Sequence, residues 1–123
     1  MKYSALARRY FDAPPNVGVL SGPAVFRGAA GARAQGTWIQ FDVQVAGAKL
    51  EAVRFLAFGC PYSIAVAAWV AEQASGRPLE PRLPEAVAAL AARFELPVEK
   101  MGRLLTVEDA WLQAIGRAID SAT

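Results

Sequence analysis

The most constraining feature of the sequence is residues 37–45, where apolar and polar side chains alternate. Such alternation is typical of a β-strand that buries one face and turns the other toward solvent. The next residues, Ala46-Gly47-Ala48-Lys49, fit a hairpin turn, and residues 50–58 are apolar enough to return as an antiparallel partner. The chain is therefore predicted to build a hairpin whose apolar face needs a cover.

Two weaker signals precede the hairpin. Residues 4–10 are predicted to form a short helix, which the paired prolines Pro14-Pro15 cannot continue. Residues 23–27 are expected to form a short strand. Residues 28–36 are mostly glycine and alanine, so we expect a loop there that packs poorly.

Three helices are predicted after the hairpin. Residues 63–75 are apolar on nearly every side, which indicates a buried helix. Residues 84–94 begin with a proline and carry apolar side chains at helical spacing. The last helix is predicted to begin at Thr106, with Asp109 completing a weak capping box. Strands followed by helices predict one α+β domain over residues 1–123, with a small antiparallel sheet of about three strands and helices packed on one face.

Histidine is absent from the 123 residues, and cysteine occurs once, as Cys60. The Cys–His and Ser–His–Asp arrangements of many nucleophilic enzymes therefore cannot form within one chain. A closed structural zinc site needs about four Cys or His ligands, and this sequence offers one. We therefore expect no enzymatic activity.

Charge and hydropathy argue against two classes of partner. The net charge is +2, and the lysines and arginines are scattered instead of gathered into the stripe that is typical of nucleic-acid binders. No apolar run reaches the ~18 residues of a membrane span. The residues Met1-Lys2-Tyr3-Ser4 lack the apolar core of a signal peptide. We expect a cytoplasmic protein without nucleic-acid or membrane partners.

Several short motifs occur in an order and spacing that are similar to those of one family. They are Tyr3-Ser4, Pro14-Pro15-Asn16-Val17-Gly18, Arg54-Phe55, Phe58-Gly59-Cys60, Ser63-Ile64-Ala65, Leu96-Pro97-Val98-Glu99-Lys100 and Glu108-Asp109-Ala110. With these motifs the chain resembles the iron–sulfur cluster assembly scaffolds of the IscU and NifU N-terminal type, over residues 3–119. The resemblance implies the U-type scaffold fold and a role in building iron–sulfur clusters before their transfer to client proteins.

The resemblance also implies a degenerate cluster site. The family holds its cluster with three cysteines, aided by an aspartate and a histidine. Counted back from Cys60, which matches the middle cysteine, the first cysteine falls on Gln35 and the aspartate on Thr37. Counted back from the last motif, the third cysteine falls on Arg103 and the histidine on Gly102. Cys60 alone survives as a cluster ligand or persulfide acceptor, and Arg103 is expected to lie close to it.

The residues at these positions are unsuited to cluster iron, which generally takes thiolate ligands. An arginine never deprotonates to act as a ligand. We expect no cluster in the isolated protein, whereas a transient [2Fe–2S] cluster across a homodimer would bring two Cys60 thiolates together. Two alternatives stay open: Cys60 as a small buried hydrophobe at a tight turn, and an ion pair of Arg103 with an acid such as Glu108.

The resemblance implies two partners. The segment Leu96-Pro97-Val98-Glu99-Lys100 is similar to the segment by which the family engages its Hsp70-type chaperone, so Leu96, Pro97, Val98 and Lys100 are candidate partner-binding residues. One proline of that motif is missing and Glu99 is added, and an ordinary connection between helices is the alternative. The other implied partner is a cysteine desulfurase. The chain is therefore predicted to be either a scaffold-like protein that keeps one sulfur or cluster ligand, or a cluster-free adaptor or regulator, for example of a desulfurase.

Overall fold

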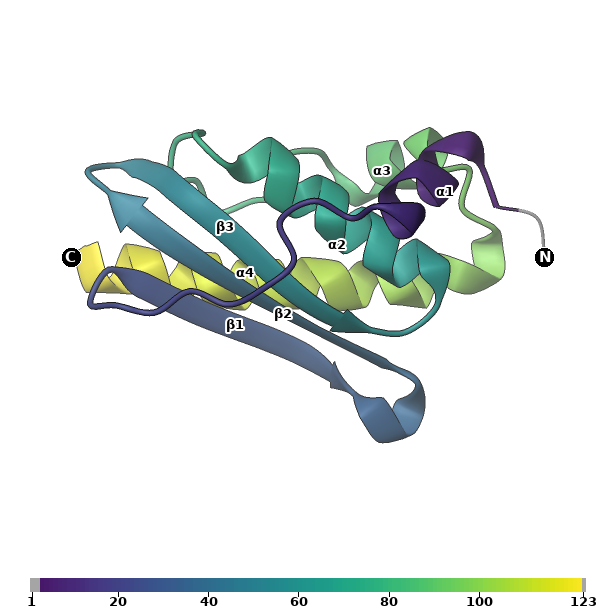
Figure 1. The fold of residues 1–123 in the computed structure, drawn as a ribbon, viewed down its shortest axis with the longest axis horizontal. Helices are drawn as coiled ribbons and strands as arrows, with labels where there is room; N and C mark the ends of the chain where they lie inside the picture. Colours follow the sequence, from purple (N-terminus) through teal and green to yellow (C-terminus); the bar gives the residue numbers. More distant parts are fainter. Residues whose placement is uncertain (1–2, 123) are drawn as a thin grey trace.

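Three antiparallel strands form one sheet in the order β1-β2-β3 in the structure, a computed structural model that describes residues 3–122 (Figure 1). They are β1 (Val25–Ala32), β2 (Thr37–Ala46) and β3 (Lys49–Phe58). The apolar residues of β2 lie on one face, where Ile39, Phe41 and Val43 are fully buried. The predicted hairpin and the α+β class are confirmed.

Helices cover the buried face of this sheet. They are α1 (Ala5–Asp12), α2 (Pro61–Ala74), α3 (Val87–Arg93) and α4 (Met101–Ala122), and two short 3-10 turns, η1 (Arg33–Gln35) and η2 (Val98–Lys100), complete the order. α4 packs along β1 and β2, α2 packs on β3, and α1 packs on α2 (Figure 1). Within residues 3–122 no helix is both long and apolar enough to cross a bilayer.

The segment between α1 and β1 pairs with the free edge of β3 and then crosses toward β1 (Figure 1). Gly18 N donates to Phe55 O at 2.9 Å, and Phe55 N donates to Asn16 O at 3.0 Å. Asn16 has φ +66°, a left-handed conformation that asparagine tolerates well, and its side-chain amide donates to Val53 O at 3.0 Å. The Pro-Pro-Asn-Val-Gly motif thus protects an exposed strand edge.

A buried carboxylate fixes the crossing segment. Asp42 of β2 is 1% exposed, and it accepts bonds from Leu20 N at 2.9 Å and from Arg27 Nε at 2.7 Å. Burial acts to raise the pKa of Asp42, but these donors outweigh it and hold that pKa below its usual value. The carboxylate therefore ties the crossing segment and β1 to the middle strand.

The predicted loop over residues 28–36 is wrong, because β1 extends to Ala32 and η1 follows it. Small side chains are what this strand requires. A Cβ atom on Gly28 would lie 2.2 Å from Ala114 N and 2.5 Å from Ala110 O, so the backbones of β1 and α4 are in contact there. The glycine and alanine content indicates close helix packing on a strand, and not a loose loop.

The predicted helix boundaries also need correction. α4 begins at Met101, before the predicted start at Thr106. The Thr106 hydroxyl donates to Gly102 O at 3.1 Å within the helix, so Thr106 is not an N-cap. α2 begins earlier than predicted, with Pro61 in its first turn, and α3 is shorter than the predicted residues 84–94.

Gly28→Ala should lower the free energy of unfolding by about 1–3 kcal/mol, because the added methyl group overlaps backbone atoms of α4. The measurement is chemical denaturation followed by circular dichroism. The matched control is Gly116→Ala on α4, where a Cβ meets nothing within 4 Å. This control should be stabilised by about 0.5–1 kcal/mol. Wild-type stability in Gly28→Ala would show that the two backbones are not in contact.

Candidate functional site

The sole cysteine stands at the junction of β3 and α2. Cys60 is the N-cap residue of α2, with Pro61 in the first turn, and its side chain is half-buried. Tyr62 is fully buried and packs edge-on against Tyr3, with ring centroids 4.8 Å apart. The free amides of the helix N-terminus are therefore next to the thiol sulfur.

The surroundings of Cys60 favour its thiolate. Burial acts to raise the pKa of the thiol, but four contacts lower it more. These are the Ser63 hydroxyl, 3.5 Å from Sγ, the backbone N–H groups of Ser63 and Tyr62, and the positive charge of Lys100. The pKa of Cys60 is therefore below its usual value, which is typical of a reactive thiol more than of a purely structural one.

The residue before β2 lies close to the turn that leads into α2. Gly36 precedes β2, and a Cβ on Gly59, just before Cys60, would be 3.5 Å from Gly36 O and 3.3 Å from Ser63 Oγ. Thr37, the residue after Gly36, is 6% exposed, and its Oγ1 has no hydrogen-bond partner among residues 3–122. The site therefore contains an unpaired buried hydroxyl beside the segment that carries Cys60.

α4 brings its first turn to the same end of the sheet. A Cβ on Gly31 would lie 2.2 Å from Thr37 O and 3.1 Å from Thr106 Cγ2, so Thr106 is adjacent to Thr37. Arg103 lies one turn earlier on α4 and is half-buried, and its Nε is buried without a partner among the described residues. Gly102 beside it is exposed, and so is Gln35 on η1.

The alternative of an ion pair between Arg103 and Glu108 does not form among residues 3–122. The closeness of Arg103 to Cys60 stays a prediction. It is supported by Lys100, which lies just before α4 and whose positive charge lowers the pKa of the Cys60 thiol.

The donor set does not fit an iron–sulfur cluster. Within residues 3–122 no three His, Cys, Asp or Glu side chains gather where they could hold a metal ion. The four further positions that the resemblance predicts, Gln35, Thr37, Gly102 and Arg103, carry an amide, a hydroxyl, no side chain and a guanidinium. None of these four positions supplies a thiolate, a carboxylate or an imidazole, so Cys60 is the one thiolate ligand available to cluster iron.

The candidate partner segment, residues 96–100, connects α3 to α4. Glu95 before it has φ +53°, and Pro97 is the N-cap of η2. Val98 is 86% exposed, while Leu96 packs against the core and Lys100 is half-buried. The segment therefore exposes the apolar side chain of Val98, two residues before Lys100, whose positive charge lowers the pKa of Cys60.

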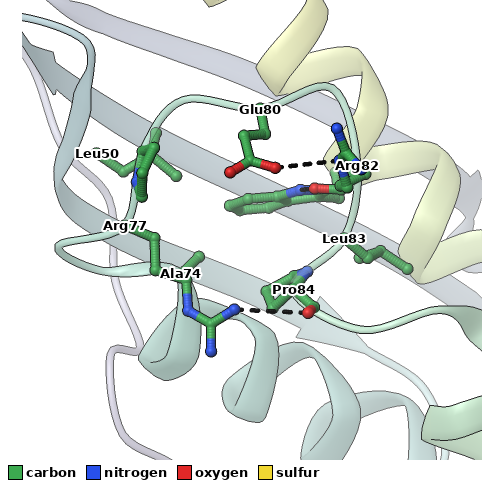
Figure 2. A pocket seen from close by; sticks show the side chains of 9 residues that line it. Leu50, Ala74, Arg77, Glu80, Arg82, Leu83 and Pro84 are labelled. Carbon is green, nitrogen blue, oxygen red and sulfur yellow. Dashed lines mark hydrogen bonds and ion pairs between the residues drawn. The ribbon is translucent and has the colours of Figure 1, made fainter.

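A small pocket lies at the opposite end of the fold (Figure 2). It holds about 80 Å³ and is lined by Leu50 and Ala74, at the far ends of β3 and α2 from Cys60. Its polar groups satisfy one another, since Trp111 Nε1 donates to Arg82 O at 2.9 Å and Glu80 pairs with Arg82 at 3.1 Å. Ligand pockets usually measure about 300–1,000 Å³, so this one is not a candidate site.

One contributor to the site was not predicted as a site residue. Ser63 was identified as part of a motif, but its hydroxyl and amide are among the main donors to Cys60. Its position three residues after the N-cap is the signal that could have found it, because the third residue of a helix has a free amide.

Comparisons with known proteins agree with the geometry. The family model described as "NifU-like N terminal domain" matches residues 2–119. The crystal structure of a nitrogen-fixing NifU-like protein (N-terminal) from Brucella abortus has a TM-score of 0.75 and 14% identity, and the match covers 95% of this chain and 94% of that one. At this identity the likeness shows the fold.

Two other structures have lower TM-scores. A putative iron–sulfur cluster assembly scaffold protein for the SUF system from Fervidobacterium islandicum AW-1 has a TM-score of 0.56 and 22% identity, over 63% of this chain and 56% of that one. A hypothetical protein has a TM-score of 0.53 and 20% identity, over 96% and 91% of the two chains. A search among curated proteins gave no match.

Ser63→Ala should raise the pKa of Cys60, because the thiolate loses its side-chain hydrogen bond. Alkylation by iodoacetamide, measured as a function of pH, should then move to higher pH and become slower near neutrality. The matched control is Ser75→Ala at the other end of α2, where the hydroxyl donates to Ala71 O. A Ser63→Ala profile identical to that of wild type would contradict this description of the thiol.

Proposed function

This chain belongs to the NifU-like N-terminal domain family of non-catalytic iron–sulfur cluster assembly scaffolds, and on this premise we propose that it accepts sulfur on Cys60 for cluster assembly. We propose further that it works as one domain in the cytoplasm and does not hold a complete cluster as a monomer. The observation that carries the proposal is the half-buried Cys60 at the N-terminus of α2, where Ser63 and Lys100 favour the thiolate.

The chemistry needs one external reactant, the persulfide that a cysteine desulfurase carries on its own cysteine. The Cys60 thiolate attacks the outer sulfur of that persulfide. A sulfur–sulfur bond forms on Cys60, the bond within the enzyme's persulfide breaks, and the enzyme's cysteine leaves as a thiolate. The proton of the persulfide moves with its outer sulfur, so atoms and charge balance. A lowered pKa of Cys60 supports this step, because the thiolate is the nucleophile.

The lack of further ligands supports the second part of the proposal. Cys60 is the one thiol in the sequence, and Arg103 and Gly102 stand where the family has a cysteine and a histidine. A [2Fe–2S] cluster would need ligands from a second copy of the chain or from free thiols. Cluster iron is therefore cargo that this chain meets transiently, across a homodimer or together with a partner.

The implied partners are a cysteine desulfurase and an Hsp70-type chaperone. Exposed Val98, next to Pro97 at the start of η2, supports a contact for the chaperone at residues 96–100. The missing proline and the added Glu99 weaken the match to the family's segment. The desulfurase is accordingly the partner on which the proposed function depends.

A second candidate function is a cluster-free adaptor or regulator of a desulfurase. The observation that favours it is Arg103 at a ligand position, because a guanidinium repels metal cations and never becomes a ligand. Such a protein would keep the family's docking surfaces and would not use Cys60.

Anaerobic incubation with a cysteine desulfurase and cysteine distinguishes these functions. We expect the intact mass of the wild type to increase by one sulfur atom, and reduction with dithiothreitol to remove it. Cys60→Ser should gain nothing, and Ser63→Ala should gain sulfur more slowly. A wild type that binds the desulfurase without any gain in mass would overturn sulfur acceptance and favour the adaptor.

A further inference from the structure

A groove between α4 and residues 81–87, which lead into α3, has no part in the proposed function. It holds about 460 Å³, within the range of about 300–1,000 Å³ that binding pockets usually have. Its walls are mostly apolar, with Leu83 and Val87 on one side and Leu105 and Leu112 of α4 on the other. None of the described residues that line it is among those that act on Cys60.

The α4 wall of the groove is an apolar flank with a carboxylate at its inner side. Leu105 and Leu112 are 48% and 39% exposed, and at 3.6 residues per turn they lie about 20° apart around the helix. Glu108 lies about 60° from Leu105, toward the buried face of α4. Glu108 therefore lines the groove between the exposed leucines and the core, and it is half-buried.

Hydrogen bonds hold the opposite wall in place. Trp111 of α4 is 1% exposed, and its Nε1 donates to Arg82 O at 2.9 Å. Arg93 Nε, in α3, donates to Glu85 Oε1 at 3.1 Å. The groove is therefore formed before a partner binds, so that little of the binding free energy is lost in ordering the chain.

Of the charged residues that line the groove, Glu108 alone lacks an ion-pair partner within residues 3–122. Arg82 pairs with Glu80 at 3.1 Å, and Glu85 pairs with Arg93. The third ion pair of the described residues lies elsewhere, on the sheet, and Glu108 takes part in none of them. A half-buried carboxylate between apolar side chains loses part of its hydration, so a cation is the complement that this groove lacks.

We propose that the groove binds an amphipathic helix of a partner protein, with apolar side chains against Leu105 and Leu112 and a lysine or arginine paired with Glu108. Helices dock in apolar grooves through side chains spaced three, four and seven residues apart. The apolar walls suit such side chains, and the unpaired carboxylate favours a basic helix over an acidic one. This inference goes beyond the proposed function and does not require that Cys60 accept sulfur.

Two synthetic helical peptides test the proposal. Each has about 15 residues with leucines along one face, flanked by lysines in one peptide and by glutamates in the other. The methyl signals of Leu105 and Leu112 are followed in ¹³C spectra. We expect saturable shifts with the lysine peptide, with a dissociation constant of about 100 μM or tighter, and about tenfold weaker binding of the glutamate peptide. Because the whole chain has a net charge of +2, non-specific attraction would favour the glutamate peptide instead.

Variants of the exposed wall locate the contact. Leu112→Ser should weaken binding of the lysine peptide by about tenfold, because it removes an apolar contact. Glu108→Gln should weaken it by about fivefold and remove most of the preference over the glutamate peptide. The matched control is Val98→Ser, which removes an apolar side chain that is 86% exposed and outside the groove, and it should bind as wild type does. All three should melt close to the wild-type temperature, because none of these side chains is fully buried.

Three results would overturn the proposal. They are shifts that do not saturate or that leave out Leu105 and Leu112, equal affinity for the two peptides, and wild-type affinity in both Leu112→Ser and Glu108→Gln. Sedimentation of the free protein tests a second copy as the occupant. We expect Leu112→Ser to leave the oligomeric state unchanged, and a dimer that it separates would also overturn the proposal.

The peptide assay is independent of sulfur chemistry. Cys60→Ser cannot accept sulfur, but it should bind the lysine peptide as wild type does. Failure of the docking site and failure of the proposed function are therefore distinguishable.

Discussion

The contact between the backbones of β1 and α4 at Gly28 is the constraint on which the rest of the structure depends. Because no side chain separates them there, α4 can lie along the sheet. Its later turns reach the outer edge of β1, where Gln113 Oε1 accepts from Ala29 N at 2.7 Å and Arg117 donates to Arg27 O at 2.6 Å. Its first turn carries Arg103 to the end of the sheet where Cys60 lies. The same packing therefore protects a strand edge and brings the first turn of α4 toward the Cys60 end of the sheet.

In this fold, the chemistry of the site depends on which side chains lie at the end of the sheet that carries Cys60. The family fold keeps the strand-to-helix turn that activates Cys60, with Ser63 and Lys100 as its supports. At two further positions that the resemblance predicts for the site, Thr37 and Arg103, one buried polar atom of each side chain lacks a hydrogen-bond partner among residues 3–122. A thiolate acceptor is compatible with this set, whereas the set offers no second thiolate for a cluster held by one chain. The shape depends on packing throughout the chain, whereas the chemistry of the site depends on a few side chains.

The sequence predicted the hairpin because the alternation in residues 37–45 has one structural solution. It wrongly predicted a loop at residues 28–32, because a strand of glycine and alanine lacks the bulky side chains by which strands are recognised. The segment of α4 that packs on this strand also lies far along the chain. The start of α4 was misplaced because Thr106 and Asp109 imitate a capping box within a continuous helix. The resemblance identified Cys60, Thr37 and Arg103, but the missing partners of Thr37 and Arg103 depend on tertiary packing and could not be predicted.

The central claim is that a scaffold fold has lost the ability to hold a cluster within one chain while keeping a reactive thiol. Anaerobic reconstitution with ferrous iron, a cysteine desulfurase and cysteine tests it most directly, with iron, sulfide and visible absorption measured on the monomer separated by gel filtration. We expect a colourless monomer without stoichiometric iron. A monomer that carries one [2Fe–2S] cluster, lost in Cys60→Ser, would contradict the claim and would require ligands other than those described here.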